Sequence, residues 1–224
     1  MNKLDHVAFI MDGNGRWGKK RSKGRNFGHI NGVKTVKKIV ESSIKLNIPV
    51  VTFYVFSTEN WKRPKGEINF LFKLIINYFN NELNNVISNG IKINIIGNLN
   101  KLPLKVKSSL KKVIKLTRNN DKIIVNLAVN YGSKSEIINA LKKLKNRKKI
   151  DIKSLRKELY TKNLPDPDIL IRTGGHKRLS NFMLWQLAYA EIYFLDKLWP
   201  DFSEKDLKKI VINYKKVKRN FGSI

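Results

Sequence analysis

The sequence predicts a single α/β domain over residues 1–224, with a mostly parallel central sheet flanked by helices. Three observations support this fold class. Short runs such as Val50–Phe56 are apolar on both faces, which is typical of strands buried in a parallel sheet. These runs alternate with longer segments whose apolar residues recur at helical spacing. No linker rich in proline or glycine and no internal repeat divides the 224 residues.

The first half of the chain begins with an apolar strand at Val7–Met11. A helix is predicted over Gly28–Leu46, where apolar residues recur at helical spacing. The Val50–Phe56 strand consists mainly of β-branched and aromatic residues, which are enriched in strands. The helix predicted over Glu67–Ile87 is apolar almost all the way round, so it is either a buried core helix or one wall of a tunnel for a lipid chain.

The same two patterns continue through the second half. Apolar runs predict strands at Ile91–Ile96, Ile123–Val129, Ile169–Ile171 and Ile192–Phe194. Helical spacing predicts helices at Leu104–Leu116, Ser135–Leu144, Ile152–Leu159, Phe182–Ala190 and Glu204–Arg219. The basic run Lys142–Lys149 is interpreted as an exposed helix end and loop, not as a domain boundary.

Composition limits the classes of protein that remain. The hydrophobic content of 42% excludes a disordered chain, and no apolar run approaches the roughly 20 residues that a membrane-spanning helix needs. The chain has no cysteine, which rules out disulfides and thiolate metal sites and fits a reducing compartment, so a cytoplasmic location is expected. No secretory leader is visible.

The net charge of +29 arises from 46 Lys and Arg against 17 Asp and Glu. Such an excess points to an anionic partner, and a basic nucleic-acid-binding protein is therefore one alternative function. Lys, Asn and Ile are all abundant, however, so most of the excess is attributed to a general compositional bias and to solvated surface. No recognised nucleic-acid-binding module is present, and no nucleic-acid partner is expected.

Polar segments follow four of the predicted strands at their carboxyl ends. These segments are Asp12–Trp17, Ser57–Trp61, Asn130–Gly132 and Arg172–Gly175. Ligands of open α/β sheets bind beyond the carboxyl ends of the strands, so the four segments are expected to converge on one site.

The first polar segment, Asp12-Gly13-Asn14-Gly15-Arg16, offers groups that suit a diphosphate and Mg²⁺. Glycine lets backbone N–H groups approach phosphate oxygens, and the Arg guanidinium matches phosphate geometry. A single Asp can hold Mg²⁺ together with the phosphates of a substrate. Read alone, the segment also fits an ordinary loop.

The second polar segment combines hydrogen-bonding and apolar groups. Ser57 and Asn60 are candidates to bind phosphate or to relay a proton, and Arg63 adds a positive charge. Trp61 is a candidate wall for an apolar substrate. The alternative is a simple strand-to-helix connection, in which Pro64 opens the next helix.

The fourth polar segment and the residues after it place Arg172 and Arg178 on either side of a Gly-Gly turn, with Ser180 following. Two guanidinium groups and a hydroxyl predict a second diphosphate site, and a basic surface loop is the alternative. Glu191 lies among apolar and aromatic residues, where a carboxylate is costly unless it is paired or bound to metal. Asp12 and Glu191 are therefore the candidate metal ligands, with an ordinary ion pair as the alternative for Glu191.

These segments resemble the cis-prenyltransferases, a family that includes the bacterial undecaprenyl diphosphate synthases. The most specific motifs are His-Val-Ala-x-Ile-Met-Asp-Gly-Asn-Gly-Arg-Trp, at residues 6–17, and Ser-Asn-Phe-x-Leu-Trp-Gln, at residues 180–186. The resemblance extends over essentially the whole chain. It implies an elongated hydrophobic cleft, a homodimer, Mg²⁺ as cofactor, and transfer of isopentenyl units onto an allylic diphosphate such as farnesyl diphosphate.

The resemblance also implies the role of individual residues. Asp12 and Asn60 are expected to be catalytic, and Asp12 and Glu191 are expected to hold Mg²⁺, with Glu191 supplied by the other subunit. The allylic diphosphate is expected near Asp12–Arg16, and isopentenyl diphosphate near Arg172–Ser180. Substrate contacts are expected at Gly13, Asn14, Gly15, Arg16, Trp17, Arg25, His29, Ser57, Thr58, Glu59, Trp61, Arg63, Arg172, Arg178, Leu179 and Ser180.

A long cis-polyprenyl diphosphate, of undecaprenyl size, is the product that the resemblance implies, for use as a cell-wall lipid carrier. Such a product partitions into the membrane, so a peripheral location at its inner face is also expected. A catalytically silent subunit of another prenyltransferase is the remaining alternative. The chain departs from the family pattern at His176, where an acidic residue is usual, and at Asn220-Phe221-Gly222, where the first residue is usually Arg and Arg219 stands one place early.

Overall fold

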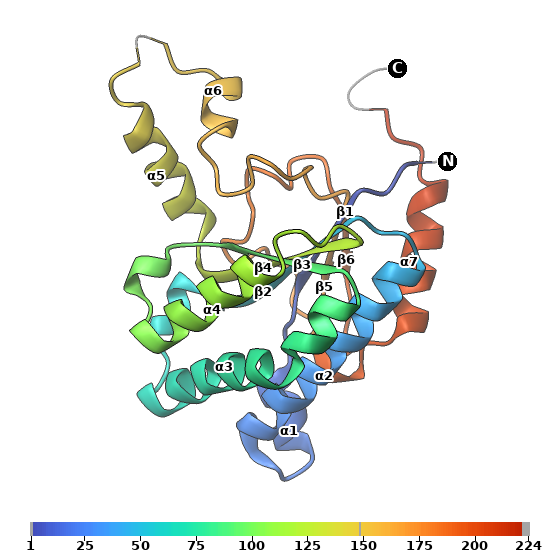
Figure 1. Cartoon of the computed structure of the whole chain (residues 1–224). Helices are drawn as coiled ribbons and strands as arrows, with labels where there is room; N and C mark the ends of the chain where they lie inside the picture. The colour runs from blue at the N-terminus through green and yellow to red at the C-terminus, as the bar shows by residue number, and fades with distance from the viewer. Residues whose placement is uncertain (1, 148, 221–224) are drawn as a thin grey trace.

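A parallel sheet forms the centre of the molecule (Figure 1), for which the computed structural model describes residues 2–147 and 149–220. The six described strands are β1 (His6–Ile10), β2 (Val50–Ser57), β3 (Ile91–Ile96), β4 (Ile123–Tyr131), β5 (Ile169–Arg172) and β6 (Glu191–Phe194). Their order is β3-β4-β2-β1-β5-β6, and each neighbouring pair is parallel. The predicted parallel sheet is therefore confirmed.

Helices connect the strands. The described α-helices are α1 (Asn14–Lys20), α2 (Gly24–Lys45), α3 (Lys65–Ser88), α4 (Leu104–Leu116), α5 (Ser133–Leu144), α6 (Ile152–Arg156) and α7 (Glu204–Lys216). Short 3₁₀ helices lie at Thr58–Lys62 (η1), Leu99–Lys101 (η2) and Trp199–Asp201 (η3). In the part of the chain that the structure describes, no helix combines the length and the apolar character needed to cross a bilayer.

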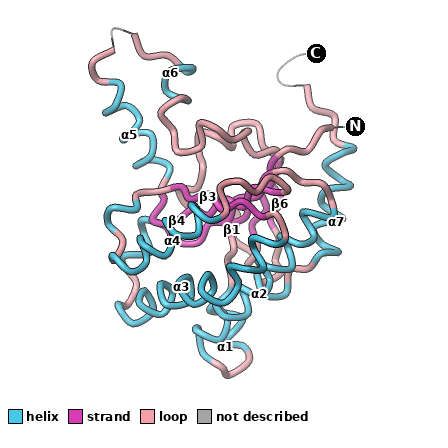
Figure 2. The backbone as a smooth tube through the Cα atoms, viewed as in Figure 1, coloured by secondary structure: helices cyan, strands magenta, loops and turns pink. Residues whose placement is uncertain are grey.

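The two faces of the sheet are covered differently, as Figure 2 shows. Val7 and Phe9 of β1 point into the larger core, which α2, α3, α4 and α7 cover. Ala8 and Ile10 alternate with them and point to the opposite face, where the loop segment carrying Phe182 packs. Side chains of alternate residues are thus buried on both faces, which explains why the strands are apolar throughout.

A chain of buried hydrogen bonds runs across the sheet on four strands. The His6 imidazole lies 2.7 Å from the Pro165 carbonyl oxygen through Nδ1 and 2.6 Å from Thr52 Oγ1 through Nε2. Asn126 Nδ2 donates to Thr52 Oγ1 (3.0 Å), and Asn94 Nδ2 donates to Asn126 Oδ1 (2.9 Å). Since a carbonyl only accepts, Nδ1 carries the proton and Nε2 accepts from the threonine hydroxyl. We call these four side chains the His6 ladder.

The structure differs from the sequence analysis at two helices. The segment Phe182–Ala190 forms turns instead of a helix, and Met183 has a φ of +44°, which a right-handed helix does not allow. Burial of Phe182, Met183 and Leu187 against the sheet overrides the helical spacing of this segment. Conversely, residues Asn14–Lys20, for which no helix was predicted, form helix α1.

Smaller differences concern the ends of elements. The predicted helix Ile152–Leu159 ends at Arg156, and the last helix ends at Lys216 instead of Arg219. Lys148, in the basic run expected to be an exposed helix end and loop, lies outside the described residues.

Candidate active site

Three of the four polar segments, those that follow β1, β2 and β5, contribute to one pocket at the carboxyl ends of the strands. The segment Asn130–Gly132 at the end of β4 instead lines a neighbouring pocket. Parallel strands end at the same edge of the sheet, so the residues that follow β1, β2 and β5 meet there. The predicted site residues that line this polar pocket are Asp12, Asn14, His29, Ser57, Asn60, Arg63, Arg172, Arg178 and Ser180.

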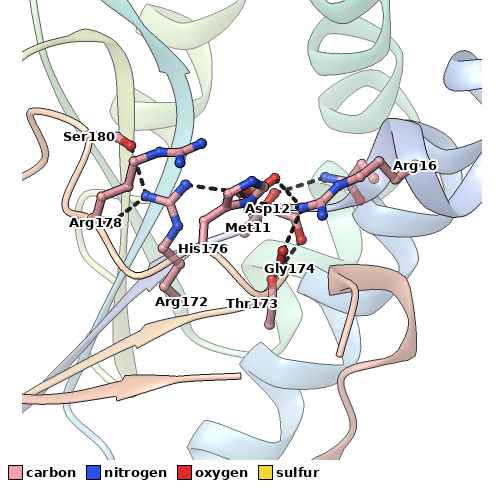
Figure 3. A network of polar contacts seen from close by, with 10 residues as sticks. Met11, Asp12, Arg16, Arg172, Thr173, Gly174, His176, Arg178 and Ser180 are labelled. Carbon is pink, nitrogen blue, oxygen red and sulfur yellow. Dashed lines mark hydrogen bonds and ion pairs between the residues drawn. The ribbon is translucent and has the colours of Figure 1, made fainter. Parts of the chain in front are cut away.

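Asp12 lies at the centre of a charged cluster (Figure 3). Its Oδ2 accepts from Arg172 Nη2 at 2.9 Å and lies 3.1 Å from His176 Nδ1, and its Oδ1 lies 3.2 Å from Arg16 Nη2. Burial would raise the pKa of the Asp12 carboxyl, but the Arg172 and Arg16 guanidinium groups hold it below its ordinary value. Asp12 is therefore ionised at neutral pH, and 26% of its side chain is exposed to the pocket and solvent.

Arg172 holds the loop of residues 173–180 around Asp12. Its Nη1 donates to Ser180 Oγ (2.8 Å) and to the Arg178 carbonyl oxygen, while Arg16 Nη2 donates to the Gly174 carbonyl oxygen (2.7 Å). Gly174 has a φ of +89°, and a Cβ there would lie 2.6 Å from Arg16 Nη2. Glycine suits this turn because it adopts the positive φ without strain and leaves room for the Arg16 guanidinium. The turn brings the two arginines to the same carboxylate.

Asn60 lies in η1, the 3₁₀ helix that follows β2. Its Oδ1 accepts the Ser57 backbone N–H at 3.2 Å, so the amide oxygen is already used by the chain. The amide NH₂ remains as a donor at the pocket that Asn60 lines. This arrangement suits an amide that donates to an anion better than one that accepts a proton.

A second charged cluster surrounds Glu67 in the first turn of α3. Arg25 donates to both Glu67 carboxylate oxygens (3.1 and 3.0 Å), and Arg63 Nη1 donates to Oε1 at 3.0 Å. His29 Nε2 lies 3.5 Å from the same oxygen. Burial lowers the pKa of His29, and the two arginines lower it further while Glu67 opposes them. The cluster ties α3 to α2 beside the polar pocket.

An apolar cleft continues from the polar pocket into the molecule. The two cavities share Met11, Asn14, His29, Val55 and Leu71, so they are continuous. Beyond this neck the cleft is lined by Val33, Val36, Phe56, Leu74, Ile75, Tyr78, Phe79, Leu127, Val129 and Trp199. The expected elongated hydrophobic cleft is thus present, between the sheet and helices α2 and α3.

Several other predicted contact residues do not line these two cavities. Gly13 has a φ of +107° just before α1, and a Cβ there would lie 2.7 Å from Leu198 Cδ2. Trp17 Nε1 donates to Asp201 Oδ1 (2.6 Å). Trp61 Nε1 donates to Asn130 Oδ1 (2.8 Å), and Trp61 lines a neighbouring polar pocket. The residues that the structure does not place among those lining the main pocket are Gly13, Gly15, Arg16, Trp17, Arg25, Thr58, Glu59, Trp61, Leu179 and Glu191.

Glu191 does not lie beside Asp12 in one chain. It opens β6 opposite Ile169, three residues before the pair formed by Arg172 and Phe194. At about 3.3 Å per residue, it is about 10 Å from the carboxyl edge of the sheet. A site that includes both carboxylates therefore requires Glu191 from a second copy of the chain.

Of the C-terminal segment that departs from the family pattern, the structure describes Arg219 and Asn220. Arg219 Nη1 donates to the Tyr214 hydroxyl at 2.7 Å and lies 3.4 Å from Asp168 Oδ1. Phe221 and Gly222 lie outside the described residues.

Sequence reasoning missed two residues of the site. Tyr54 lines the polar pocket from the middle of β2, where its spacing indicates only a strand residue. Asn181 belongs to the Ser-Asn-Phe motif but was given no role; its side chain donates to Glu59 Oε1 at 2.8 Å. An asparagine directly after a basic loop is a usable signal, because Asn tolerates positive φ better than most residues.

The donor set around Asp12 is compatible with Mg²⁺ if a diphosphate supplies further oxygens. Among the described residues, no three His, Asp or Glu side chains are grouped so that they could hold a metal ion by themselves. Mg²⁺ is commonly held by one or two carboxylates together with substrate phosphates and water. An ionised, partly exposed Asp12 at the mouth of the pocket fits that pattern.

Comparison with known proteins gives consistent results. Residues 10–222 match the model of the prenyltransferase family described as putative undecaprenyl diphosphate synthase. The isoprenyl transferase of Fusobacterium nucleatum is 44% identical, with 98% of this chain and 96% of that protein covered. The isoprenyl transferase of Rickettsia typhi is 43% identical, with 99% of each chain covered.

Two solved structures share the fold. Lavandulyl diphosphate synthase from Lavandula x intermedia, in complex with dimethylallyl diphosphate, superposes with a TM-score of 0.94 at 32% identity, covering 98% of each chain. A probable undecaprenyl diphosphate synthase from Campylobacter jejuni superposes with a TM-score of 0.85 at 39% identity, covering all of both chains. The fold and the sequence therefore point to the same family.

Proposed function

This chain belongs to the prenyltransferase family of putative undecaprenyl diphosphate synthases, and from that premise we propose that it extends an allylic diphosphate with isopentenyl diphosphate units to a long cis-polyprenyl diphosphate. The chain is a prenyl-transferring enzyme. The comparisons give no support to the alternatives of a nucleic-acid-binding protein or a silent subunit.

One observation carries the proposal: a polar pocket rich in arginine opens directly into an apolar cleft. A prenyl diphosphate has the same two parts, a dianionic or trianionic head and a hydrocarbon tail. Guanidinium groups recognise the head through paired hydrogen bonds, and burial of the tail against Val36, Leu74 and Phe79 removes apolar surface from water.

The polar pocket has two sides, one formed by residues at and after the end of β5 and the other beside the neck of the apolar cleft. Arg172 ends β5, and Arg178 and Ser180 lie on the loop that follows it. We place the diphosphate of isopentenyl diphosphate on this side. Asp12, Asn14 and His29 lie beside the neck, where the allylic diphosphate fits with its tail in the cleft. The isopentenyl double bond then attacks the allylic carbon, the bond from that carbon to its diphosphate breaks, and inorganic diphosphate leaves. Loss of a proton to a diphosphate oxygen gives the new cis double bond.

The residues act mainly on charge and orientation. Arg172 and Arg178 neutralise a diphosphate, and fixed donors stabilise the negative charge that grows on the leaving group. Asn60 donates its amide NH₂ and orients a diphosphate, whose oxygens are better proton acceptors than an amide.

Mg²⁺ is the cofactor that this donor set fits, with Asp12 as its protein ligand and Glu191 of a second copy of the chain as the other candidate. When bound, such an ion supplies further positive charge at the leaving diphosphate. A homodimer is part of the proposal for that reason. We also propose that the enzyme works in the cytoplasm and releases its product at the inner face of the membrane.

The test is incorporation of radiolabelled isopentenyl diphosphate into butanol-extractable lipid, with farnesyl diphosphate and Mg²⁺ present. We expect time-dependent incorporation and a product whose chain length chromatography resolves. Omission of farnesyl diphosphate is the control. A pure, folded protein that incorporates no label with farnesyl, geranyl or dimethylallyl diphosphate would contradict the proposal.

A further inference from the structure

Asn181 connects three segments around the polar pocket. Its Nδ2 donates to Glu59 Oε1 in η1 at 2.8 Å. Its Oδ1 accepts the backbone N–H of Lys134 at 2.9 Å, and its carbonyl oxygen accepts that of Ser133 at 2.8 Å. One residue therefore joins the loop after β5, the 3₁₀ helix after β2 and the first turn of the helix after β4.

The backbone at Asn181 explains why asparagine occupies this position. Asn181 has a φ of +62°, and its neighbour Ser180 has a φ of +50°. Among residues with a side chain, asparagine is one of those that adopt this left-handed conformation most readily. Unfavourable backbone conformations persist only where surrounding contacts enforce them, and they concentrate at functional sites.

Asn181 is connected on two sides to residues of the proposed active site. On one side, Ser180 Oγ accepts from Arg172 Nη1 at 2.8 Å, and the Ser180 carbonyl oxygen accepts from the Tyr54 hydroxyl at 3.3 Å. On the other side, Glu59 is the residue before Asn60, whose Oδ1 accepts the Ser57 N–H. The two walls of the pocket are thus linked through the Asn181 side chain.

The electrostatics of Glu59 agree with this link. Burial would raise the pKa of the Glu59 carboxyl, but hydrogen bonds, that from Asn181 foremost, hold it below its ordinary value. Glu59 is therefore an ionised acceptor, and hydrogen bonds to an ionised group are stronger than those between neutral groups.

We propose that Asn181 is a positioning residue for prenyl transfer, which keeps the Arg172–Ser180 loop and the η1 segment at the separation that the two reacting substrates need. This inference rests on the proposed function. Bond formation requires the reacting carbons to approach within about 3–3.5 Å, and a misplacement of about 1 Å can cost about 100-fold in rate. Asn181 itself does not line the pocket and acts through Ser180 and Asn60.

A charge-exchange pair tests the link. In Asn181→Asp, one oxygen still accepts the Lys134 N–H, but the other faces the Glu59 carboxylate, so the contact becomes repulsive. In the double variant Asn181→Asp/Glu59→Gln, the glutamine NH₂ donates to the new aspartate and restores the hydrogen bond. We expect kcat of Asn181→Asp to fall about 100-fold with little change in KM for farnesyl diphosphate, and the double variant to return to within about threefold of Glu59→Gln.

Asn181→Gly is the second variant, because glycine accepts the positive φ while lacking the side chain. It should fold and show the same loss of kcat. A kcat within twofold of wild type for Asn181→Gly, or a double variant no more active than Asn181→Asp, would overturn the proposal.

A measurement without turnover separates this proposal from the proposed function. The thermal unfolding midpoints of the wild type, the two single variants and the double variant form a double-mutant cycle. This cycle measures the interaction between Asn181 and Glu59 even if the wild type transfers no prenyl group. If the double variant recovers the unfolding midpoint but not kcat, the contact is purely structural, which contradicts the positioning role.

Discussion

Two polar clusters associated with the central sheet differ in charge and in burial. The His6 ladder lies toward the amino ends of the strands and is neutral; His6, Thr52 and Asn126 have no exposed surface. The cluster around Asp12 lies at the carboxyl ends, is charged, and is open to the pocket. The sheet therefore carries one set of polar side chains that joins strands and a second set that faces the polar pocket.

The clusters also differ in how completely their hydrogen bonds are satisfied. Among the described residues, four buried side-chain atoms have no hydrogen-bond partner: Asn14 Oδ1, His29 Nε2, Arg172 Nε and Gln186 Oε1. The first three belong to residues that line the polar pocket, and none belongs to the His6 ladder. Unsatisfied groups of this kind are costly in a core but are expected where a ligand completes the contacts. Changes in the two clusters should therefore affect different measurements.

The largest expected effect is on catalysis, in the variant Asp12→Asn. The amide keeps an acceptor for Arg172 but removes the negative charge, so we expect kcat/KM to fall at least about 10³-fold, or about 4 kcal/mol of transition-state stabilisation. Circular dichroism and thermal unfolding should show a folded protein. Steady-state kinetics over a range of Mg²⁺ concentrations provide the measurement.

The neighbouring variant His176→Gln is the matched control, because it changes a side chain on the same carboxylate without removing the charge of Asp12. It should retain far more activity than Asp12→Asn. Turnover of Asp12→Asn close to wild type would exclude Asp12 as the metal ligand.

The second effect is a change of about 3 kcal/mol in the free energy of unfolding, and it comes from His6 in the His6 ladder. Burial lowers the pKa of His6 to about 4, against about 6.5 in an unfolded chain. Between these values the unfolded state binds the proton and the folded state does not, so protonation favours unfolding. The stabilisation is complete above pH 6.5 and is lost as the pH falls toward 4. Urea unfolding at several pH values measures it.

His6→Gln is the control for this pH dependence, since glutamine does not titrate. Its free energy of unfolding should change less between pH 6.5 and pH 4 than that of the wild type. Identical pH profiles for the two proteins would show that His6 is not the group responsible.

The sequence predicted the sheet and the convergence at its edge because both depend on local patterns. Strands that are apolar on both faces, such as Val50–Ser57, have few alternatives to a buried parallel sheet. Once the strands are parallel, the carboxyl ends of β1 and β5 lie at the same edge of the sheet. Asp12 and Arg172 form an ion pair there at 2.9 Å.

The features that the sequence did not predict depend on contacts between distant segments. Residues Phe182–Ala190 have helical spacing, yet the sheet face that they cover accepts a turn with Met183 at positive φ. Glu191 has the chemistry of a metal ligand, but the residue pattern by itself does not show that the register of β6 places it away from Asp12 within one chain. The role proposed for Asn181 likewise depends on Glu59, which is 122 residues away in the chain.

The smallest expected effect tests whether the two diphosphates bind on separate sides of the polar pocket. Arg178 is exposed on the loop after β5 and lines the pocket. Arg178→Ala should therefore raise KM for isopentenyl diphosphate about tenfold. This change corresponds to about 1.4 kcal/mol, which is the order of one hydrogen bond to a charged group. KM for the allylic primer should change less than twofold, because that diphosphate is placed beside Asp12 and His29. Lys177→Ala, which removes an exposed positive charge one residue away that does not line the pocket, is the control for general electrostatic attraction. Equal increases in both KM values for Arg178→Ala would show that the two diphosphates do not occupy separate sides of the pocket.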